Sequence, residues 1–438
     1  FGVREMGGND PVTPDTLMLI GSTTKTMTTM LMAQLVDDGI MDWDTPVVDI
    51  MPTFTVADPE ITQMITVQHL VCACTGVPRR DFEMIFNSED TGAEGIIESL
   101  ADFEFFTGFG EAFQYSNQMV ATGGYVAAMA AGGEYGNLYE DYLALMQERI
   151  FDTVGMPNTT FSFDKAKASG NYGIPHDNNI ALEYSPMSLD VEEALLGPVV
   201  PAGGAWSNVM DMARYLVTEL DEGVAPDGTR VVSAENLKKT WEPQVAITDD
   251  ASYGLGWIVD EYKGLKVLHH GGNTNGFTSD LAFIPDVDLG ISVLTNQYGS
   301  LFNQLVRFRL LELMYQQDPQ FEEAAQFQID MMKKASDEVM AQIQESINTE
   351  EIAPYLGQYS NAALGDITVQ WQQDKLIFDS GEFQAEIRAR INDEGELSYV
   401  LYDSLLSGLP VKTEETEDGR YVIVIGLGVN EYTFEKVE

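Results

Sequence analysis

The sequence has few of the residues that bind metal ions. Only four histidines occur among 438 residues, and they do not form the His-Glu-x-x-His pattern of a zinc-binding helix. The two cysteines, Cys72 and Cys74, are one residue apart. A bridge between them would close a small ring, so we do not expect a disulfide, and two thiols alone do not make a zinc site. The sequence therefore predicts neither a metal site nor a cofactor.

Basic residues and long apolar runs are also scarce. The 23 Lys and Arg residues face 70 Asp and Glu, which gives a formal net charge of −47, and such a field repels nucleic acid and anionic membranes. No run of about 18 apolar residues occurs, so no transmembrane helix is expected. We interpret the acidity as a solubility device suited to an extracytoplasmic or secreted protein. Steering of cationic substrates is the alternative.

The composition and hydrophobic pattern of the chain change twice along its length. A hydrophobic share of 44% with 10% aromatics is enough for a packed core. Residues 1–317 show helical patterns followed by strands, which predicts an α+β fold with helices around an antiparallel sheet. Residues 318–350 are polar and favour helix, which predicts a connector. Residues 351–438 carry regularly spaced short strands, which predicts a small up-and-down β-barrel.

Apolar periodicity places the individual elements. Helices are expected at 23–36, 67–74, 118–131 and 208–219. Strands of the first region are expected at 267–272, 281–285 and 290–295, and strands of the barrel at 366–372, 375–378, 385–391, 397–402, 421–425 and 431–434.

The first of these helices opens on Ser22-Thr23-Thr24-Lys25. A hydroxyl and an amine three positions apart at a helix start lie on the same face, within reach of each other. A lysine kept neutral there can accept the hydroxyl proton, and the serine N–H at the positive end of the helix can help to bind an oxyanion. The same pattern at 162–165 is followed by no apolar helix, and we interpret that copy as chance.

Two further motifs bring a phenol, an amide and an imidazole. Tyr115-Ser116-Asn117 precedes an apolar helix; a phenol can shuttle a proton, and an amide can hold a substrate amide or a lysine. Similar tripeptides at 135–137 and 359–361 lack that setting, and a capping or core tyrosine is the common reason for such a pattern. His269-His270-Gly271-Gly272-Asn273 ends a strand, where small residues let a substrate lie along the strand edge. A satisfied core histidine is the alternative there.

Together these motifs, in this order and at wide spacing, resemble the family of class C β-lactamases, D-Ala-D-Ala carboxypeptidases, D-aminopeptidases and family VIII esterases. The likeness covers residues 1 to about 315. It implies a β-lactamase/transpeptidase-like fold with an additional all-helical subdomain, and it implies that the first strands of the family's sheet are missing from this chain or supplied elsewhere. The tail after about residue 350 resembles the lipocalin-like barrel of some peptidase members. The supporting stretches are 16–25, 66–78, 151–157, 201–207 and 253–257.

The resemblance assigns roles to four residues. Ser22 would be the acylated nucleophile, and Lys25 its proton acceptor. Tyr115 would protonate the leaving group and then activate the deacylating water. Asn117 would orient the substrate and the lysine.

It also assigns roles to the strand motif. His270 takes the place of the lysine in the family's Lys-Thr-Gly triplet, with His269 as the alternative register. Gly271, Gly272 and Asn273 would bind substrate, and the oxyanion hole would be formed by the N–H groups of the nucleophile and of Asn273. A neutral imidazole offers no fixed cation for the carboxylate of a β-lactam, which lowers the rank of antibiotic hydrolysis.

The predicted function is acyl transfer to water by a serine hydrolase. A peptidase or amidase that acts on small or D-amino-acid-containing peptides is favoured, and a family VIII-type carboxylesterase is the nearest alternative. A β-lactamase ranks lower, and a non-catalytic binding protein on the same scaffold is the alternative of another class. The expected partner is a small peptide, amide or ester; the chain is also a candidate homo-oligomer.

Overall fold

The computed structural model describes residues 1–88, 91–403, 405–427 and 430–437. The chain divides into two compact units. The first consists of Phe1–Asp81, Asp90–Pro175 and Ser188–Gln316, and the second of Phe82–Glu89, His176–Met187 and Gln317–Glu438.

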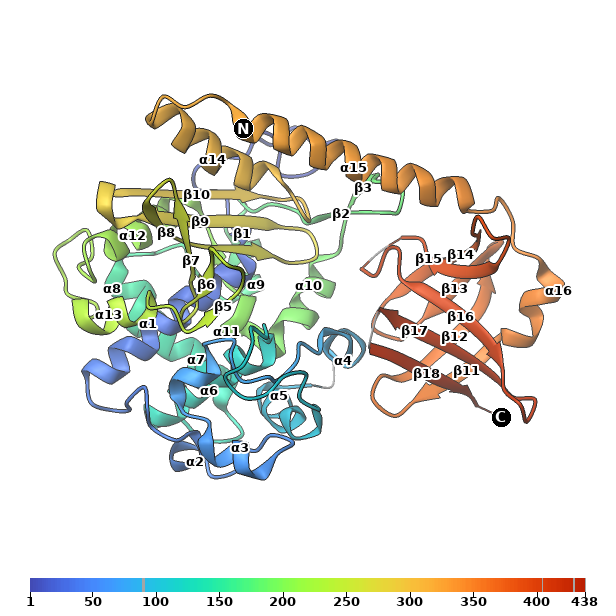
Figure 1. Cartoon of the computed structure of the whole chain (residues 1–438), viewed down its shortest axis with the longest axis horizontal. Coiled ribbons are helices and arrows are strands. Elements are labelled where there is room, and N and C mark those ends of the chain that lie inside the picture. The colour runs from blue at the N-terminus through green and yellow to red at the C-terminus, as the bar shows by residue number, and fades with distance from the viewer. Residues whose placement is uncertain (89–90, 404, 428–429, 438) are drawn as a thin grey trace. The chain divides into compact units, whose positions relative to one another are not determined.

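The first unit is built around a six-stranded antiparallel sheet (Figure 1). Its strand order is β10-β9-β8-β7-β6-β5. The three strands expected from the sequence form one edge of this sheet, so the predicted α+β fold with an antiparallel sheet is confirmed. The bounds are β5 Val245–Ala246, β6 Ser252–Tyr253, β7 Ile258–Tyr262, β8 Leu265–Asn273, β9 Thr278–Ile284 and β10 Leu289–Thr295.

Strand β9 is buried along its whole length because both faces of the sheet are covered. Since side chains alternate along a strand, Ala282 and Ile284 pack with Leu311 of α14 (Phe302–Met314). Phe283, which points to the opposite face, meets the rings of Trp241 and Trp257 with centroids 5.2 and 5.0 Å apart. On that side α12 (Val209–Leu220) packs against β10.

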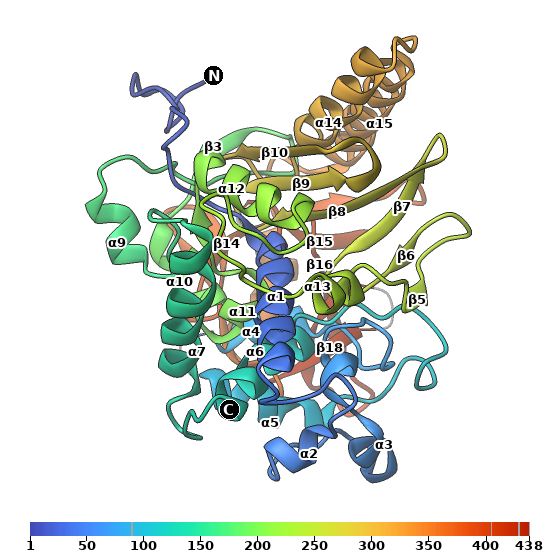
Figure 2. The same ribbon diagram turned by 90° about the vertical axis from the view of Figure 1, so that its left-hand side faces the viewer.

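The first long helix, α1 (Thr24–Asp37), is almost entirely buried and runs through the middle of the unit (Figure 2). It packs against α6 (Asn117–Ala130), α11 (Val200–Gly203) and α13 (Ala234–Thr240). Its threonines are satisfied inside the core: Thr28 Oγ1 donates to the Pro201 carbonyl at 2.7 Å, and the Tyr215 hydroxyl donates to Thr26 Oγ1 at 3.0 Å. The helices expected at 23–36, 118–131 and 208–219 are confirmed as α1, α6 and α12.

The other helices of this unit are shorter, and one expectation among them was wrong. The helix expected at 67–74 is only a 3-10 turn at Val67–Leu70, after which the chain turns through Cys72 and Cys74. The remaining α-helices are α2 Val47–Ile50, α3 Pro59–Met64, α5 Ala93–Ser99, α7 Leu138–Met146, α8 Asp152–Val154, α9 Phe163–Ala168 and α10 Leu189–Leu196, and a two-stranded ribbon pairs β1 Met18–Leu19 with β4 Trp206–Ser207.

Cys72 and Cys74 form a disulfide, so the expectation of two separate thiols was wrong. Ala73 between them has a φ of +53°, and this left-handed conformation folds the chain back locally. The two Cα atoms are therefore 5.2 Å apart, which suits a disulfide, whereas an extended chain would separate them by about 7 Å. The Ala73 and Cys74 carbonyls accept the backbone N–H groups of Gln114 and Gly110 at 2.8 Å, which holds the turn.

The second unit contains a closed eight-stranded barrel with strands in sequence order. The predicted barrel is confirmed, and six of its strands lie where the sequence placed them. The two missed strands, β11 and β16, lack a clear alternation of apolar residues: β16 begins with Pro410, and half of its residues are charged. The strands are β11 Gly357–Asn361, β12 Gly365–Gln372, β13 Lys375–Asp379, β14 Gln384–Ile391, β15 Leu397–Leu401, β16 Pro410–Glu415, β17 Tyr421–Leu427 and β18 Asn430–Lys436.

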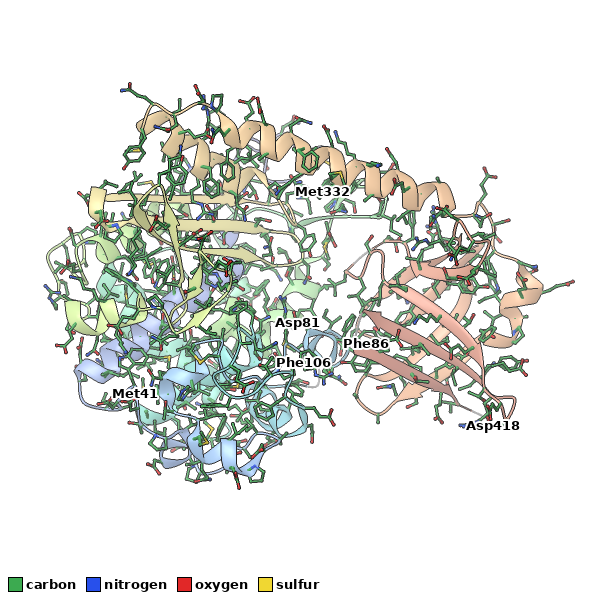
Figure 3. The ribbon with its side chains drawn as sticks, viewed as in Figure 1. Met41, Asp81, Phe86, Phe106, Met332 and Asp418 are labelled. Carbon is green, nitrogen blue, oxygen red and sulfur yellow. A yellow bond between two sulfur atoms is a disulfide. The ribbon has the colours of Figure 1, made fainter. Side chains whose placement is uncertain are left out.

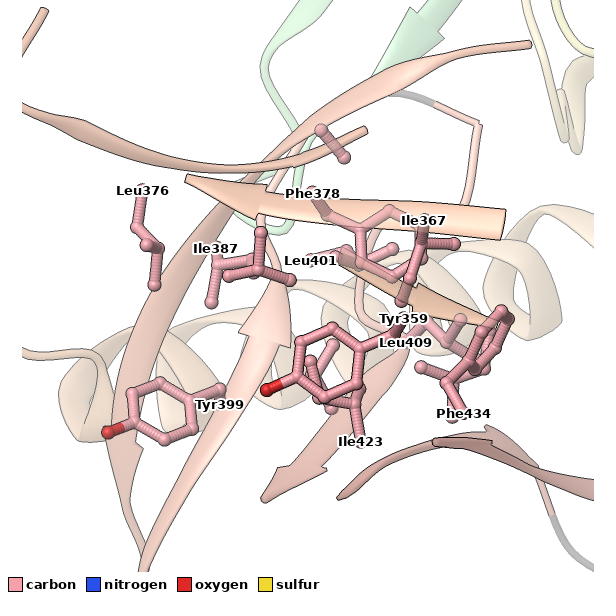
Figure 4. Close-up of a cluster of buried hydrophobic side chains, with 14 of the residues drawn as sticks. Tyr359, Ile367, Leu376, Phe378, Ile387, Tyr399, Leu401, Leu409, Ile423 and Phe434 are labelled. Atoms are coloured by element: carbon pink, nitrogen blue, oxygen red, sulfur yellow. The ribbon is translucent and has the colours of Figure 1, made fainter. Parts of the chain in front are cut away.

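The interior of the barrel is filled with side chains, as Figure 4 shows. One of them comes from outside the C-terminal region: Phe86, in α4 (Asp81–Phe86), is buried among Phe378, Phe383 and Phe434, with ring centroids 5.3–6.2 Å apart. Figure 3 labels Phe86 beside the barrel. The sequence pattern contained no signal that this residue belongs to the barrel core.

A second early segment also joins this unit. The hairpin of β2 (His176–Asn178) and β3 (Tyr184–Pro186) places Ile180 against Val400 and Tyr402. Ser336 of α15 (Gln320–Gln342) donates to the Ile180 carbonyl at 2.7 Å. α15 and the short α16 (Thr349–Ile352) occupy the region expected to be a helical connector. Within the described ranges, no helix combines the length and the hydropathy needed to cross a bilayer.

Candidate active site

The nucleophile segment packs against strands β8 and β9 of the sheet. Ser22 lies in a 3-10 turn (Gly21–Thr23) that leads into α1, and its side chain is only half-buried. Gly21 has a φ of +52°, and a Cβ there would come within 2.8 Å of the Asn273 nitrogen. Thr23 Oγ1 and Ser279 Oγ are 2.7 Å apart, and Ser279 Oγ donates to the Ile20 carbonyl at 2.6 Å. These contacts bring the backbone N–H of Asn273 next to the start of the turn that carries Ser22.

Lys25 lies one helical turn later, fully buried, with Nζ 2.9 Å from Ser22 Oγ. Nζ also donates to Asn117 Oδ1 at 2.8 Å and to the Ala202 carbonyl at 2.7 Å. Burial, and then the charge of Arg79, hold the Lys25 pKa well below its usual value. A neutral amine has two N–H bonds, which match the two acceptors, so its lone pair is left for the Ser22 hydroxyl.

Tyr115 and Asn117 reach the serine from the start of α6. The Tyr115 phenol is hydrogen-bonded to the Ser22 side chain, and its ring centroid lies 4.8 Å from Lys25 Nζ. Burial raises the Tyr115 pKa, so the phenol keeps its proton. Asn117 Nδ2 donates to Asp81 Oδ1 at 3.3 Å. The amide therefore links the lysine to a carboxylate.

His270 comes from β8 and lies behind the phenol. Its ring centroid is 6.2 Å from that of Tyr115. Nδ1 is 2.7 Å from the Gly271 carbonyl, which can only accept, so Nδ1 carries the proton and Nε2 accepts from the Tyr253 hydroxyl at 3.1 Å. Burial, and then the nearby Lys25, lower the His270 pKa to about 3. The imidazole is therefore neutral near pH 7.

His269, the alternative register, points to the other face of the strand. Its Nε2 lies 3.6 Å from a carboxylate oxygen of Asp260. The structure thus brings Ser22, Lys25, Tyr115, Asn117 and His270 into one centre and leaves His269 outside it.

Gly271 and Gly272 differ in their surroundings. A Cβ on Gly272 would lie 2.0 Å from the Ile20 carbonyl oxygen and 2.4 Å from Ser279 Oγ, whereas a Cβ on Gly271 would meet only Ser279 O, at 3.8 Å. Gly272 is therefore needed for the close approach of β8 to the nucleophile segment.

We expect Gly272→Ala to lower the free energy of unfolding by about 1–3 kcal/mol because a neighbour must move to admit the methyl group. The shift of the nucleophile should also lower activity by about 10²-fold. Thermal unfolding and kcat/KM measure the two effects. Gly271→Ala is the matched control, with a stability change within about 0.5 kcal/mol; equal destabilisation by both substitutions would contradict this account of Gly272.

Sequence reasoning missed four side chains around the centre. Tyr253 belongs to a stretch that supports the family resemblance, and its ring packs on Tyr115 and Phe113 with centroids 6.1 and 5.6 Å apart. Arg79 and Asp81 form an ion pair directly after the stretch at 66–78 that supports the family resemblance, and the Arg79 guanidinium carbon is 5.8 Å from the Tyr115 ring centroid. The only sequence signal for these two residues was their position after that stretch.

The other copies of the motifs have structural roles. Ser162 caps α9, and its Oγ accepts the Lys165 backbone N–H at 3.2 Å. Tyr135 donates to Glu98 on the surface, and Tyr359 is in the barrel core. In the part of the chain that the structure describes, no three His, Cys, Asp or Glu side chains are grouped as metal ligands.

Comparison with known sequences identifies the family. The family model described as Beta-lactamase matches residues 1–314. The chain is 25% identical over 408 residues to the unguisins hydrolase ungD' of Aspergillus campestris, which covers 86% of this chain and 72% of the relative. It is 27% identical over 319 residues to penicillin-binding protein 4 of Amycolatopsis lactamdurans, covering 71% of this chain and 81% of the relative.

Solved structures share the fold. The octameric penicillin-binding protein homologue from Pyrococcus abyssi aligns with a TM-score of 0.64 at 18% identity, over 100% of this chain and 92% of that one. A D-stereospecific amidohydrolase from Streptomyces aligns with a TM-score of 0.52 at 20% identity, over 66% of this chain and 84% of the other. With the match of the family model over most of its length, the chain belongs to the β-lactamase family and is a serine hydrolase.

Proposed function

We propose that the protein hydrolyses amide bonds in small peptides through an acyl-enzyme on Ser22. The observation that carries this proposal is the buried Lys25 amine, 2.9 Å from Ser22 Oγ and held by two acceptors. Such an amine can act as a base near neutral pH without an additional charge relay.

In acylation, the Lys25 lone pair takes the Ser22 proton while Oγ attacks the amide carbonyl carbon. The negative charge that develops on the carbonyl oxygen would be stabilised by the backbone N–H groups of Ser22 and Asn273. Collapse of the tetrahedral intermediate breaks the C–N bond and leaves the acyl group on Ser22.

An amine leaves only after it gains a proton, which is why the phenol favours an amide substrate. Tyr115 is protonated and hydrogen-bonded to Ser22, so it can donate to the leaving nitrogen and recover a proton from Lys25. In deacylation Tyr115 would take a proton from the attacking water while passing its own to the neutral Lys25, and Ser22 Oγ would regain a proton as the ester bond breaks. Asn117 would hold the lysine and the substrate amide.

The alternative functions require fewer of the residues in this centre. An ester has a better leaving group and would react without the phenol, so a carboxylesterase remains the second candidate. The neutral His270 lies where the family has a lysine, which argues against a β-lactamase. The D-stereospecific amidohydrolase among the fold relatives supports tests with D-configured peptides, and a non-catalytic binding protein would show no turnover.

A fluorophosphonate probe followed by peptide mass spectrometry tests the proposal. We expect one phosphonylated residue, Ser22, and turnover of D- or L-alanine anilides at a rate comparable with that of matched p-nitrophenyl esters corrected for their reactivity. Labelling at another serine, or no labelling, would refute the nucleophile. Cleavage of esters alone would establish the carboxylesterase instead, and cleavage of nitrocefin alone the β-lactamase.

Self-association is proposed as well. α15 exposes Phe327, Met331 and Met332, with Phe327 66% exposed. Phe327 and Met331, four positions apart, lie on one face of the helix. One fold relative is described as octameric. We expect light scattering to show an oligomer that Phe327→Gln with Met331→Gln dissociates; the exposed pair Lys333→Gln with Lys334→Gln is the control. A native monomer would contradict the proposal.

A further inference from the structure

Arg79 supplies positive charge beside the Tyr115 ring. Its guanidinium carbon lies 5.8 Å from the centroid of the Tyr115 ring, and its charge acts on both Lys25 and Tyr115. Lys25 and His270, the other basic groups of the centre, have lowered pKa values. Because arginine stays protonated at every working pH, the permanent cation of this centre is Arg79.

The guanidinium is held by one edge and open at the other. Arg79 Nε donates to Asp81 Oδ2, and Asp81 Oδ1 accepts from Asn117. Among the described residues, this is the hydrogen bond that Arg79 makes, and its side chain is 57% exposed. The terminal Nη1 and Nη2 groups therefore keep four of the five N–H donors for a ligand.

The ion pair with Asp81 fixes the direction of these donors. A guanidinium anchored through Nε presents its two terminal nitrogens as a fork that matches the two oxygens of a carboxylate. Its orientation is set before a ligand arrives, so less entropy is lost on binding. Asp81 reduces the net charge of the pair but is itself occupied by Arg79 and Asn117.

We propose that Arg79 is a specificity residue that binds a carboxylate carried by the substrate near the scissile bond. This inference rests on the proposed amide hydrolysis and adds the class of substrate: small peptides with an anionic group. The carboxylate belongs either to the acyl part or to the leaving amine.

Two pairs of substrates separate these sources. N-succinyl-alanine p-nitroanilide carries a carboxylate on the acyl side, and N-acetyl-alanine p-nitroanilide is its neutral partner. N-acetyl-alanine 4-carboxyanilide carries a carboxylate on the leaving side, with the unsubstituted anilide as its partner. D- and L-alanine forms are used for each compound, and the quantity measured is the ratio of kcat/KM between the charged and the neutral substrate.

We expect Arg79→Gln to lower this ratio by roughly 10- to 100-fold in one pair, the loss of a charge-assisted bidentate contact. Arg79→Lys should lower it less, because an ammonium keeps the charge without the fork. Arg80→Gln is the matched control because it removes the same charge from the neighbouring residue. The Arg80 guanidinium carbon lies over the Phe103 ring, 5.7 Å from its centroid. An unchanged ratio in both pairs for Arg79→Gln, or an equal fall for Arg80→Gln, would overturn the proposal.

Protection of Ser22 against fluorophosphonate labelling measures the binding of a ligand without requiring its turnover. N-succinyl-alanine amide should slow labelling of the native protein more than N-acetyl-alanine amide does, and Arg79→Gln should abolish the difference. If no anilide is cleaved by the native protein, amide hydrolysis is refuted, while protection still decides whether Arg79 binds a carboxylate. Equal protection by both amides would exclude a carboxylate on the acyl side, and equal protection by N-acetyl-alanine 4-carboxyanilide and the unsubstituted anilide as well would reject the Arg79 site.

Discussion

Replacing Ser22 with alanine should lower kcat/KM for the best substrate by about 10⁴- to 10⁶-fold. The substitution removes the atom that forms the covalent intermediate, and the Lys25 amine then has no hydroxyl to deprotonate. Among the residues that the structure describes, the half-buried Oγ is bonded within the catalytic centre alone, so we expect the melting temperature to change little. Steady-state kinetics and intact-mass detection of the acyl or phosphonyl adduct measure the effect.

Ser162→Ala is the matched control, because Ser162 begins the second Ser-x-x-Lys sequence. Its Oγ caps α9, so its loss should cost about 0.5–2 kcal/mol of stability and leave turnover at the native rate. If Ser22→Ala keeps more than a hundredth of the native activity in a preparation free of native protein, the acyl-enzyme on Ser22 is excluded.

The fold was predictable where apolar periodicity is long and local. α1 and β8–β10 carry apolar patterns long enough to specify the element, and the barrel strands β12–β15 are short and regularly spaced. The plug of the barrel by Phe86 and the packing of Ile180 were not predictable. Both depend on contacts between segments more than 150 residues apart, and neither short segment has a pattern of its own.

The residues of the active centre also divide into those that the sequence predicted and those that it did not. The family motifs marked Ser22, Lys25 and Tyr115, and the structure brings them together. Arg79 and Asp81 belong to no sequence motif. Their position beside the Tyr115 phenol depends on how the chain turns after Pro78, and residue spacing in the sequence does not reveal that turn. The Cys72–Cys74 disulfide was missed for a similar reason: the left-handed Ala73 shortens a distance that sequence separation alone overstates.

Lys25→Met should lower kcat by about 10³- to 10⁴-fold, the upper range for loss of a general base. Methionine nearly fills the volume of the lysine in the buried site but accepts no proton, so the Ser22 hydroxyl is no longer activated. The pH profile carries the more specific prediction. The native enzyme needs the neutral amine, so kcat/KM should fall as the pH drops through the lowered Lys25 pKa.

Other buried groups titrate near neutral pH, and their effect on the pH profile has to be separated from that of the lysine. Burial raises the pKa of Glu219 to about 8 and that of Glu192 to about 7, and Glu219 is hydrogen-bonded to Tyr215, which contacts α1. His270, with its pKa near 3, is neutral throughout. If Lys25 causes the fall of kcat/KM at low pH, that fall is absent in Lys25→Met and still present in Glu219→Gln. The opposite pattern would show that the pH dependence comes from the buried carboxyl and that Lys25 is not the base.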